Sequence, residues 1–167
     1  MKALLEASDD KAVIPPTPGQ KNPPYRILLV EDDREVRHVN IAVLLRSGYE
    51  VAAAEDGAAA WEALSANSYD LLITDHNMPR LTGVELLKKL SAAHMALPSI
   101  LISGAMPTEE LKRHPWLQIE ATLLKPFTTD ELLATVRNIL RATDGAREQL
   151  APPPNWQSQP SAVGLQS

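Results

Sequence analysis

The sequence contains no cysteine and no long run of apolar residues. The lack of cysteine excludes disulfides, thiolate metal sites and cysteine nucleophiles. No stretch approaches the roughly 18 apolar residues of a membrane span, and the N-terminus is acidic where a signal peptide needs an apolar core. The net charge of −5 gives no basic excess for binding nucleic acid. We therefore expect a cytoplasmic protein that contacts neither a membrane nor nucleic acid.

Proline is unevenly distributed along the 167 residues. Nine of the 14 prolines lie before residue 25 or after residue 151, among Ser, Gln, Ala and Gly. Such composition is typical of solvated linkers. A chain of this length holds one ordinary domain with a substantial core, and hardly two. We therefore expect flexible tails at residues 1–24 and 143–167, on either side of one domain at residues 25–142.

Between these tails the apolar pattern alternates between strands and helices. Short apolar runs predict strands at residues 26–30, 49–54, 71–74, 99–102 and 121–124. Helical spacing predicts five helices. The first covers residues 34–46, the second begins at residue 57, the third covers 83–95, the fourth runs from 108 to Pro115, and the fifth follows residue 128. Thr108 is the expected cap of the fourth helix, and Thr128 or Thr129 that of the fifth. The residues at helical spacing in the first helix are Val36, Val39, Val43 and Leu44. The alternation predicts an α/β fold with a mostly parallel, doubly wound sheet.

Polar side chains follow four of the predicted strands. Asp75 ends the apolar run that begins at Leu71, and open α/β sheets place ligands at such strand ends. The other strand-end residues are Glu31 and Asp32, Ser103, and Lys125. Crowded carboxylates favour a hard divalent cation or raised pKa values, and oxygen-only ligands favour Mg²⁺ over zinc. The set predicts that Asp75 attacks phosphorus to form an acyl phosphate, with Ser103 and Lys125 at the phosphoryl oxygens.

Five motifs in this order resemble the receiver domain of two-component response regulators over residues 25–142. They are ILLVEDD (27–33), LLITDHNMP (71–79), Gly83, ILISG (100–104) and LLKPF (123–127). The resemblance implies a flavodoxin-like sheet of order 2-1-3-4-5 with five helices. It also implies Asp75 as phosphoacceptor and Mg²⁺ as cofactor. The implied metal ligands are Asp32, Asp75, the backbone carbonyl of Asn77, and Glu31 mainly through water. Ser103 is the implied switch hydroxyl, and Lys125 the phosphate-binding lysine.

The resemblance also implies partners and a mode of output. The phosphoryl donor is a phosphohistidine on a sensor histidine kinase or a histidine phosphotransfer protein. The residues after 142 are too few for an output domain, so the chain resembles a stand-alone, chemotaxis-type regulator rather than an enzyme, acting on an unknown downstream protein. Thr122 stands where the family usually has a Tyr or Phe switch residue. We expect the segment 105–119 to carry the signal instead, with Trp116 as its large apolar contact; a static Trp116 over the core is the alternative.

Two other functions stay open. A phosphate sink, or a binding module independent of phosphorylation, needs no aromatic residue at position 122. A phosphohydrolase of the haloacid dehalogenase type also forms an aspartyl phosphate. It carries a second aspartate two residues after the nucleophile, where this chain has Asn77, and it carries a cap insertion that this chain lacks.

Overall fold

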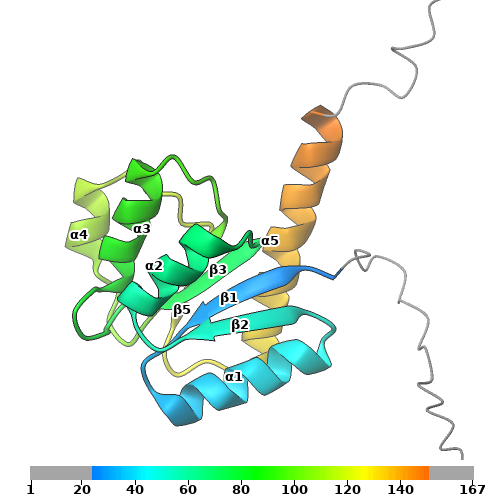
Figure 1. Ribbon diagram of the computed structural model, residues 1–167, viewed down its shortest axis with the longest axis horizontal. Coiled ribbons are helices and arrows are strands. Elements are labelled where there is room, and N and C mark those ends of the chain that lie inside the picture. Colours follow the sequence, from blue (N-terminus) through cyan, green and yellow to red (C-terminus); the bar gives the residue numbers. More distant parts are fainter. Residues whose placement is uncertain (1–23, 151–167) are drawn as a thin grey trace, which may run out of the picture.

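Five parallel strands form a single sheet in the computed structural model, which describes residues 24–150 (Figure 1). The strands are β1 (Arg26–Val30), β2 (Glu50–Ala54), β3 (Leu71–Asp75), β4 (Ser99–Ser103) and β5 (Ala121–Leu124). Their order is β2-β1-β3-β4-β5, and every neighbouring pair is parallel. The predicted fold class and strand order are therefore confirmed.

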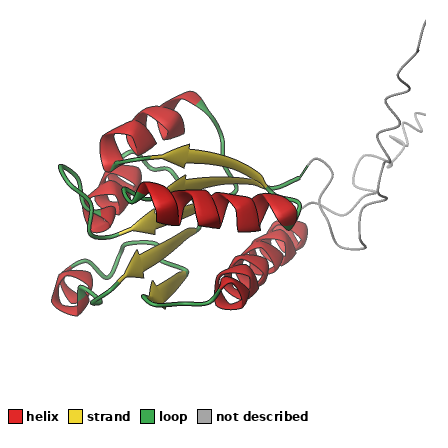
Figure 2. Ribbon diagram, turned by 90° about the horizontal axis from the view of Figure 1, so that it is seen from below, coloured by secondary structure: helices red, strands yellow, loops and turns green. Residues whose placement is uncertain are grey.

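Helices cover both faces of this sheet (Figures 1 and 2). They are α1 (Arg34–Arg46), α2 (Gly57–Ala66), α3 (Gly83–Ala92), α4 (Thr108–Arg113) and α5 (Thr129–Leu150). Successive strand residues point to opposite faces, so Leu28 and Val30 pack in the core under α2 and α3, while Ile27 and Leu29 pack with α1 and α5. Burial on both faces explains why β1 and β3 are continuous apolar runs. Within residues 24–150, no helix combines the length and apolar character needed to cross a bilayer.

Several predicted details of the helices differ from the structure. Val39 does not lie on the buried face of α1: its side chain is 57% exposed, and Asn40 is buried instead. Thr108 does not cap α4, because Pro107 holds the cap position and Thr108 is the first helical residue. α3 ends at Ala92, short of the expected residue 95, and His94 follows with a positive φ of 55°.

Thr128 caps α5. Its hydroxyl accepts a hydrogen bond from the Glu131 backbone N–H at 3.1 Å, and the Glu131 carboxylate accepts one from the Thr128 N–H at 2.7 Å. This reciprocal pairing satisfies two N–H groups that a helix start leaves without partners. Of the two threonines that were predicted as possible caps, Thr128 and Thr129, Thr128 is therefore the cap.

The C-terminal part of α5 is longer than expected. The helix continues to Leu150, so the expected domain boundary at residue 142 falls inside it. The Tyr25 hydroxyl donates a hydrogen bond to the Asp144 carboxylate, and Arg147 lies 3.7 Å from Asp70. Asp70 in turn accepts a 2.9 Å hydrogen bond from the Arg26 N–H. These contacts join the last turns of α5 to the start of β1. Residues 1–23 and 151–167 of the predicted tails lie outside the described residues.

Removing the Asp144 carboxylate is expected to destabilise the domain below pH 10. Asp144→Ala should lower the free energy of unfolding by about 1 kcal/mol, the typical value of one such hydrogen bond. Burial and the bond to Asp144 raise the pKa of Tyr25 from 10.0 to about 12. The phenol is a donor only while protonated, so its contribution is full below pH 10 and is lost as pH rises toward 12.

Urea denaturation between pH 7 and pH 11 measures this difference. Glu148→Ala is the control one turn further along α5, at an exposed position where no hydrogen bond or ion pair of Glu148 is present among the described residues. Equal stability of Asp144→Ala and Glu148→Ala at pH 7 would contradict the assigned role of Asp144.

Candidate functional site

Three carboxylates lie together at the carboxyl edge of the sheet. One oxygen from each of Glu31, Asp32 and Asp75 lies within 4.8 Å of the other two. β1 and β3 are parallel neighbours with Val30 paired to Thr74, so the residues that follow these positions meet at the same edge. Glu31 and Asp75 are buried, whereas Asp32 is exposed. The three acids predicted as metal ligands through their side chains are therefore brought together.

Lys125 reaches this group from the end of β5. Its Nζ lies 3.4 Å from an oxygen of Glu31 and 3.4 Å from an oxygen of Asp75. Burial lowers the pKa of Lys125, but the carboxylates of Asp75 and Glu31 outweigh burial and raise this pKa above its usual 10.5. The lysine is thus a permanent cation between two acids at neutral pH.

The charge of the three acids is only partly balanced. Burial is the main cause that raises the pKa of Asp75; Lys125 opposes it and Asp32 adds to it. Burial also raises the pKa of Glu31, against a hydrogen bond from the Asp33 N–H. Asp75 Oδ1 is buried and has no hydrogen-bond partner among the described residues. An oxygen-only group with a buried acceptor and spare negative charge suits a hard cation such as Mg²⁺.

Arg37, which was not among the predicted site residues, supports the acidic pair. Its Nη1 donates to the Glu31 carbonyl at 2.7 Å and to the Asp32 carbonyl at 3.4 Å. The Asp33 carboxylate accepts from the N–H groups of Glu35 and Val36, which fixes the start of α1 next to the site. The sequence pattern that could have predicted this role is a basic residue one turn into the helix that follows the acidic pair.

Ser103 lies at the same edge, but its hydroxyl is engaged elsewhere. Its Oγ donates to the Ala105 carbonyl at 2.6 Å, and it accepts from the Ala105 N–H at 3.3 Å. The Ser103 carbonyl accepts from the Lys125 N–H at 2.9 Å, which joins β4 to β5 beside the site. The hydroxyl therefore contacts the loop that leads to α4.

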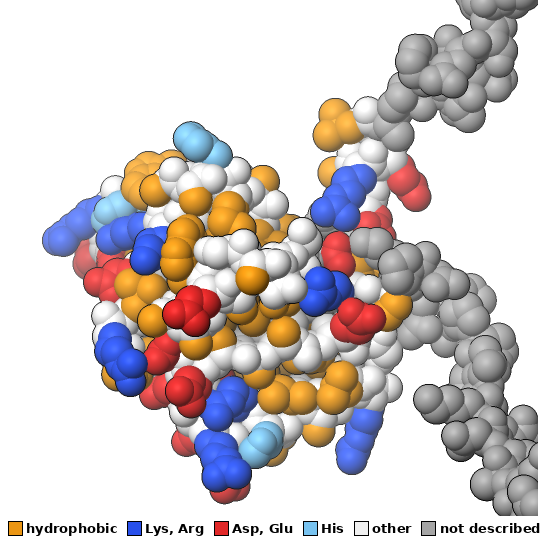
Figure 3. All heavy atoms as spheres, in the orientation of Figure 1, with side chains coloured by type: hydrophobic (Ala, Val, Ile, Leu, Met, Phe, Trp, Pro, Cys, Tyr) orange, Lys and Arg blue, Asp and Glu red, His pale blue; other side chains and the backbone are white. Residues whose placement is uncertain are grey.

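The remaining predicted residues lie outside the carboxylate group. Asn77 follows Asp75 in the β3–α3 loop, and its side chain is exposed. Thr122 lies on β5 opposite Leu101 and is exposed. Trp116 lies in the segment between α4 and β5 and is 54% exposed. Acidic and basic side chains are interspersed along the left and lower edges of the face drawn in Figure 3.

Comparison with known proteins gives consistent matches. Residues 27–137 match the family described as the response regulator receiver domain. The chain is 36% identical over 131 residues to the response regulator MprA of Mycolicibacterium vanbaalenii, a match that covers 77% of this chain and 57% of that protein. The chain thus spans little more than half the length of this relative.

Solved structures agree with this match. The receiver domain of a Francisella response regulator is 28% identical, with a TM-score of 0.66 over 71% of this chain and 98% of that domain. The response regulator TrrA of Thermotoga maritima, solved in complex with Mg²⁺-BeF, is also 28% identical. Its TM-score is 0.61, over 69% of this chain and 98% of that protein.

Proposed function

Because the chain belongs to the receiver domain family of response regulators, we propose that it accepts a phosphoryl group on Asp75. The donor is a phosphohistidine on a sensor histidine kinase or a histidine phosphotransfer protein. One observation carries this proposal: Lys125 Nζ lies 3.4 Å from both Asp75 and Glu31, beside a buried Asp75 oxygen without a hydrogen-bond partner in residues 24–150. A cation beside the attacking carboxylate, and an attacking oxygen without another hydrogen bond, would favour phosphoryl transfer to Asp75, and this supports the proposal.

The transfer step uses groups of this chain in distinct roles. An Asp75 carboxylate oxygen attacks phosphorus, an O–P bond forms, and the P–N bond to the donor imidazole breaks. The imidazole leaves with the electron pair and takes up a proton. The Lys125 ammonium, which already contacts Asp75, pairs with one phosphoryl oxygen. The Ser103 hydroxyl turns away from the Ala105 carbonyl and donates to a second phosphoryl oxygen.

The residues present fit a Mg²⁺ ion. Asp32, Asp75 and the backbone carbonyl of Asn77 would hold it, with Glu31 mainly through water. When bound, the ion neutralises negative charge on the phosphoryl oxygens. Arg37 contributes by holding the Glu31 and Asp32 carbonyls, which orients both carboxylates.

Mg²⁺ is expected to raise the melting temperature of the protein. A ligand that binds only the folded state stabilises it by about 2.7 kcal/mol at 100 times its Kd. Differential scanning fluorimetry with a MgCl₂ series, against EDTA, measures the shift. Asp32→Asn should lose most of it, whereas Asp33→Asn, which changes an exposed carboxylate at the same edge, should keep it. Equal shifts in both variants would argue against the assigned ligands.

The output is proposed to be a changed contact with a downstream protein, and the chain is proposed to act as a switch rather than as an enzyme. The match covers 57% of the MprA relative. That this protein acts as a single-domain regulator is therefore part of the proposal. The cytoplasmic location and the lack of nucleic-acid and membrane contacts stay predictions. A phosphate sink is the second candidate, favoured by the exposed Thr122 at the position of the usual aromatic switch residue.

Incubation with acetyl phosphate and Mg²⁺, followed by intact-mass measurement, tests the proposal. A stable increase by one phosphoryl group per chain supports a receiver, and its absence supports a binding module. Rapid turnover of many phosphate esters supports a phosphohydrolase. A sink becomes phosphorylated as well, but drains a donor phosphohistidine without any change in the segment 105–119.

A further inference from the structure

Asp56 is a buried carboxylate outside the group formed by Glu31, Asp32 and Asp75. It lies in the turn between β2 and α2, and only 6% of the residue is exposed. Its Oδ1 accepts a hydrogen bond from the Ala59 N–H at 2.8 Å and so caps α2. Its Oδ2 lies 3.4 Å from Nη1 of an arginine in the β3–α3 loop, Arg80. One buried acid thus contacts two segments of the chain.

Arg80 has a backbone conformation that is unusual for a residue with a Cβ. Its φ is 69°, in the left-handed region where such residues are strained. The side chain is 75% exposed, so burial does not hold the residue in place. Within residues 24–150, the ion pair with Asp56 is the one polar contact of this side chain. The pair is therefore the side-chain contact that can offset the cost of the left-handed conformation.

The turn that carries Asp56 contacts both loops of the proposed metal site. On one side, the Ala54 carbonyl accepts from the Glu31 N–H at 3.1 Å, at the start of the β1–α1 loop. On the other side, Leu81 of the β3–α3 loop packs so closely on Gly57 that an added Cβ would lie 2.7 Å from Leu81 Cβ. The ion pair is thus part of a contact between the β2–α2 turn and the β3–α3 loop.

The β3–α3 loop also carries Asn77, whose backbone carbonyl is a proposed Mg²⁺ ligand. This carbonyl accepts no hydrogen bond from the part of the chain that the structure describes. Its position therefore depends on the residues around it. Met78 is buried in the core at 7% exposure and fixes one side, and Arg80 is held by Asp56 on the other.

We propose that the Asp56–Arg80 ion pair positions the β3–α3 loop for Mg²⁺, an inference that rests on the proposed function. The pair keeps Arg80 in its left-handed conformation and so limits the conformations of the Asn77 carbonyl before the ion binds. When only a fraction of molecules has the binding conformation, the apparent Kd equals the intrinsic Kd divided by that fraction. The pair therefore strengthens Mg²⁺ binding, although neither side chain is a ligand. Both are positioning residues.

Arg80→Ala in the full chain, titrated with MgCl₂ in a calorimeter, tests the proposal. The Kd for Mg²⁺ should rise by about tenfold, the low end of the usual effect of losing a group that supports a metal ligand. Plain electrostatics predicts the opposite sign, because removal of a positive charge favours binding of a cation. Arg80→Lys keeps the charge and should retain most of the affinity. An unchanged or lower Kd in Arg80→Ala overturns the proposal.

Asp56→Asn separates the ion pair from the helix cap. Asparagine keeps an oxygen for the Ala59 N–H but loses the charge that pairs with Arg80. Because each single variant loses the same contact, the double variant Asp56→Asn/Arg80→Ala should bind Mg²⁺ about as weakly as either one. Losses that multiply in the double variant would mean that the two residues act independently, against the proposal.

Hydrogen exchange in EDTA gives a readout without the metal. The N–H groups of Met78 and Leu81 donate to the His76 and Pro79 carbonyls at 3.1 Å and 2.8 Å. Both should exchange faster in Arg80→Ala, because the loop opens more often. The N–H groups of the paired strands β1 and β3 should exchange at the parent rate. Faster exchange in these strands as well would indicate general destabilisation and overturn the local role.

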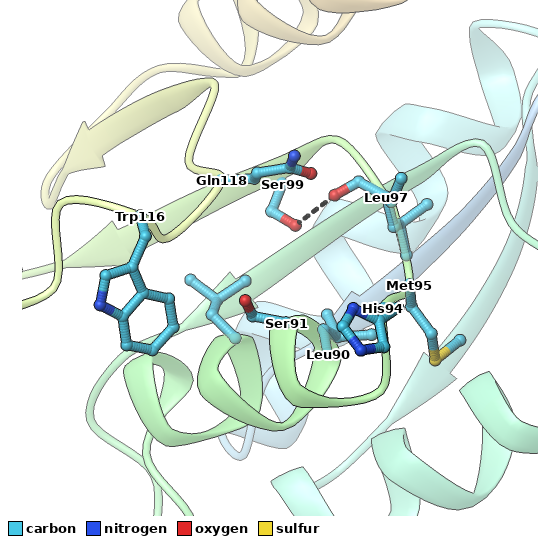
Figure 4. Close-up of a pocket in the computed structure, with 10 residues that line it drawn as sticks. Leu90, Ser91, His94, Met95, Leu97, Ser99, Trp116 and Gln118 are labelled. Atoms are coloured by element: carbon cyan, nitrogen blue, oxygen red, sulfur yellow. Dashed lines mark hydrogen bonds between the residues drawn. The ribbon is translucent and has the colours of Figure 1, made fainter.

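His94→Gly is the matched control for the backbone. His94 is the other non-glycine residue with a positive φ in residues 24–150, at 55°. It follows the end of α3, whose first residue is Gly83 beside Asp75, and it lies at the cavity drawn in Figure 4. Glycine adopts a left-handed φ without strain, so Arg80→Gly should recover part of the affinity that Arg80→Ala loses. His94→Gly should keep the parent Kd.

Two failures are distinguishable. A parent protein that neither binds Mg²⁺ nor gains mass with acetyl phosphate overturns the proposed function. A parent protein that does both, with the same Kd in Arg80→Ala, overturns the positioning role alone. A weaker Kd in His94→Gly, equal to that of Arg80→Ala, would also contradict the role of the ion pair, because His94 lies away from the β3–α3 loop.

Discussion

Asp75→Asn is expected to abolish the mass increase with acetyl phosphate completely. The amide cannot attack phosphorus as a carboxylate does, and neither Glu31 nor Asp32 offers an oxygen with the same surroundings. Glu31 and Asp75 are both buried and both contact Lys125, but of the three acids in the described chain only Asp75 has a buried oxygen without a hydrogen-bond partner. Intact-mass measurement after incubation with Mg²⁺ gives the result directly. Labelling that persists in the variant would place the acceptor elsewhere.

The loss of labelling should not come from unfolding. Burial raises the pKa of Asp75, so its charged form costs stability at every pH above that raised pKa and costs nothing below 3.8. The neutral amide removes this cost, and Asp75→Asn should be at least as stable as the parent at pH 7 in urea denaturation. Asp33→Asn changes an exposed cap carboxylate of α1 at the same edge and should be labelled normally.

Much of the site follows from strand ends that local sequence reveals. Glu31, Asp75, Ser103 and Lys125 each come at the end of an apolar run, and parallel strands bring such ends to one edge. The order that makes β3 the neighbour of both β1 and β4 came from the family resemblance, because periodicity does not fix strand order. The orientation of the Ser103 hydroxyl toward Ala105 depends on the turn that follows β4, which the motif does not describe.

The end of α5 shows where local reasoning fails. Asp144-Gly145 has the composition of a stop signal, yet the helix continues through both residues. The partner of Asp144 is Tyr25, 119 positions away in the sequence. Val39 illustrates the same limit on a smaller scale: helical spacing allowed two adjacent faces of α1, and packing against the sheet buries the one with Asn40 and Leu44. Contacts between distant segments decided both outcomes.

Gly83→Ala is expected to lower the free energy of unfolding by about 3 kcal/mol, at the upper end of the usual cost of overpacking. A Cβ at this position would lie 2.4 Å from the Asp75 carbonyl oxygen and 2.9 Å from Leu101 Cδ1. Gly83 begins α3, and its N–H donates to the His76 carbonyl at 3.0 Å, so the helix start and the end of β3 are held in close contact. Urea denaturation measures the loss. Gly104→Ala is the control, because a Cβ there meets nothing within 4 Å.

The site of the clash makes Gly83→Ala a test of the phosphoacceptor as well as of packing. The atom that must move is the backbone carbonyl oxygen of Asp75. Acetyl phosphate should therefore label the folded Gly83→Ala variant more slowly than it labels Gly104→Ala. Adding Leu101→Val removes the Cδ1 contact and leaves the carbonyl contact in place. If the carbonyl is the cause, the double variant regains little stability and little labelling rate. Full recovery of stability and labelling rate in the double variant would instead show that the clash with the Leu101 side chain causes the loss. The start of α3 would then have no direct effect on phosphorylation of Asp75.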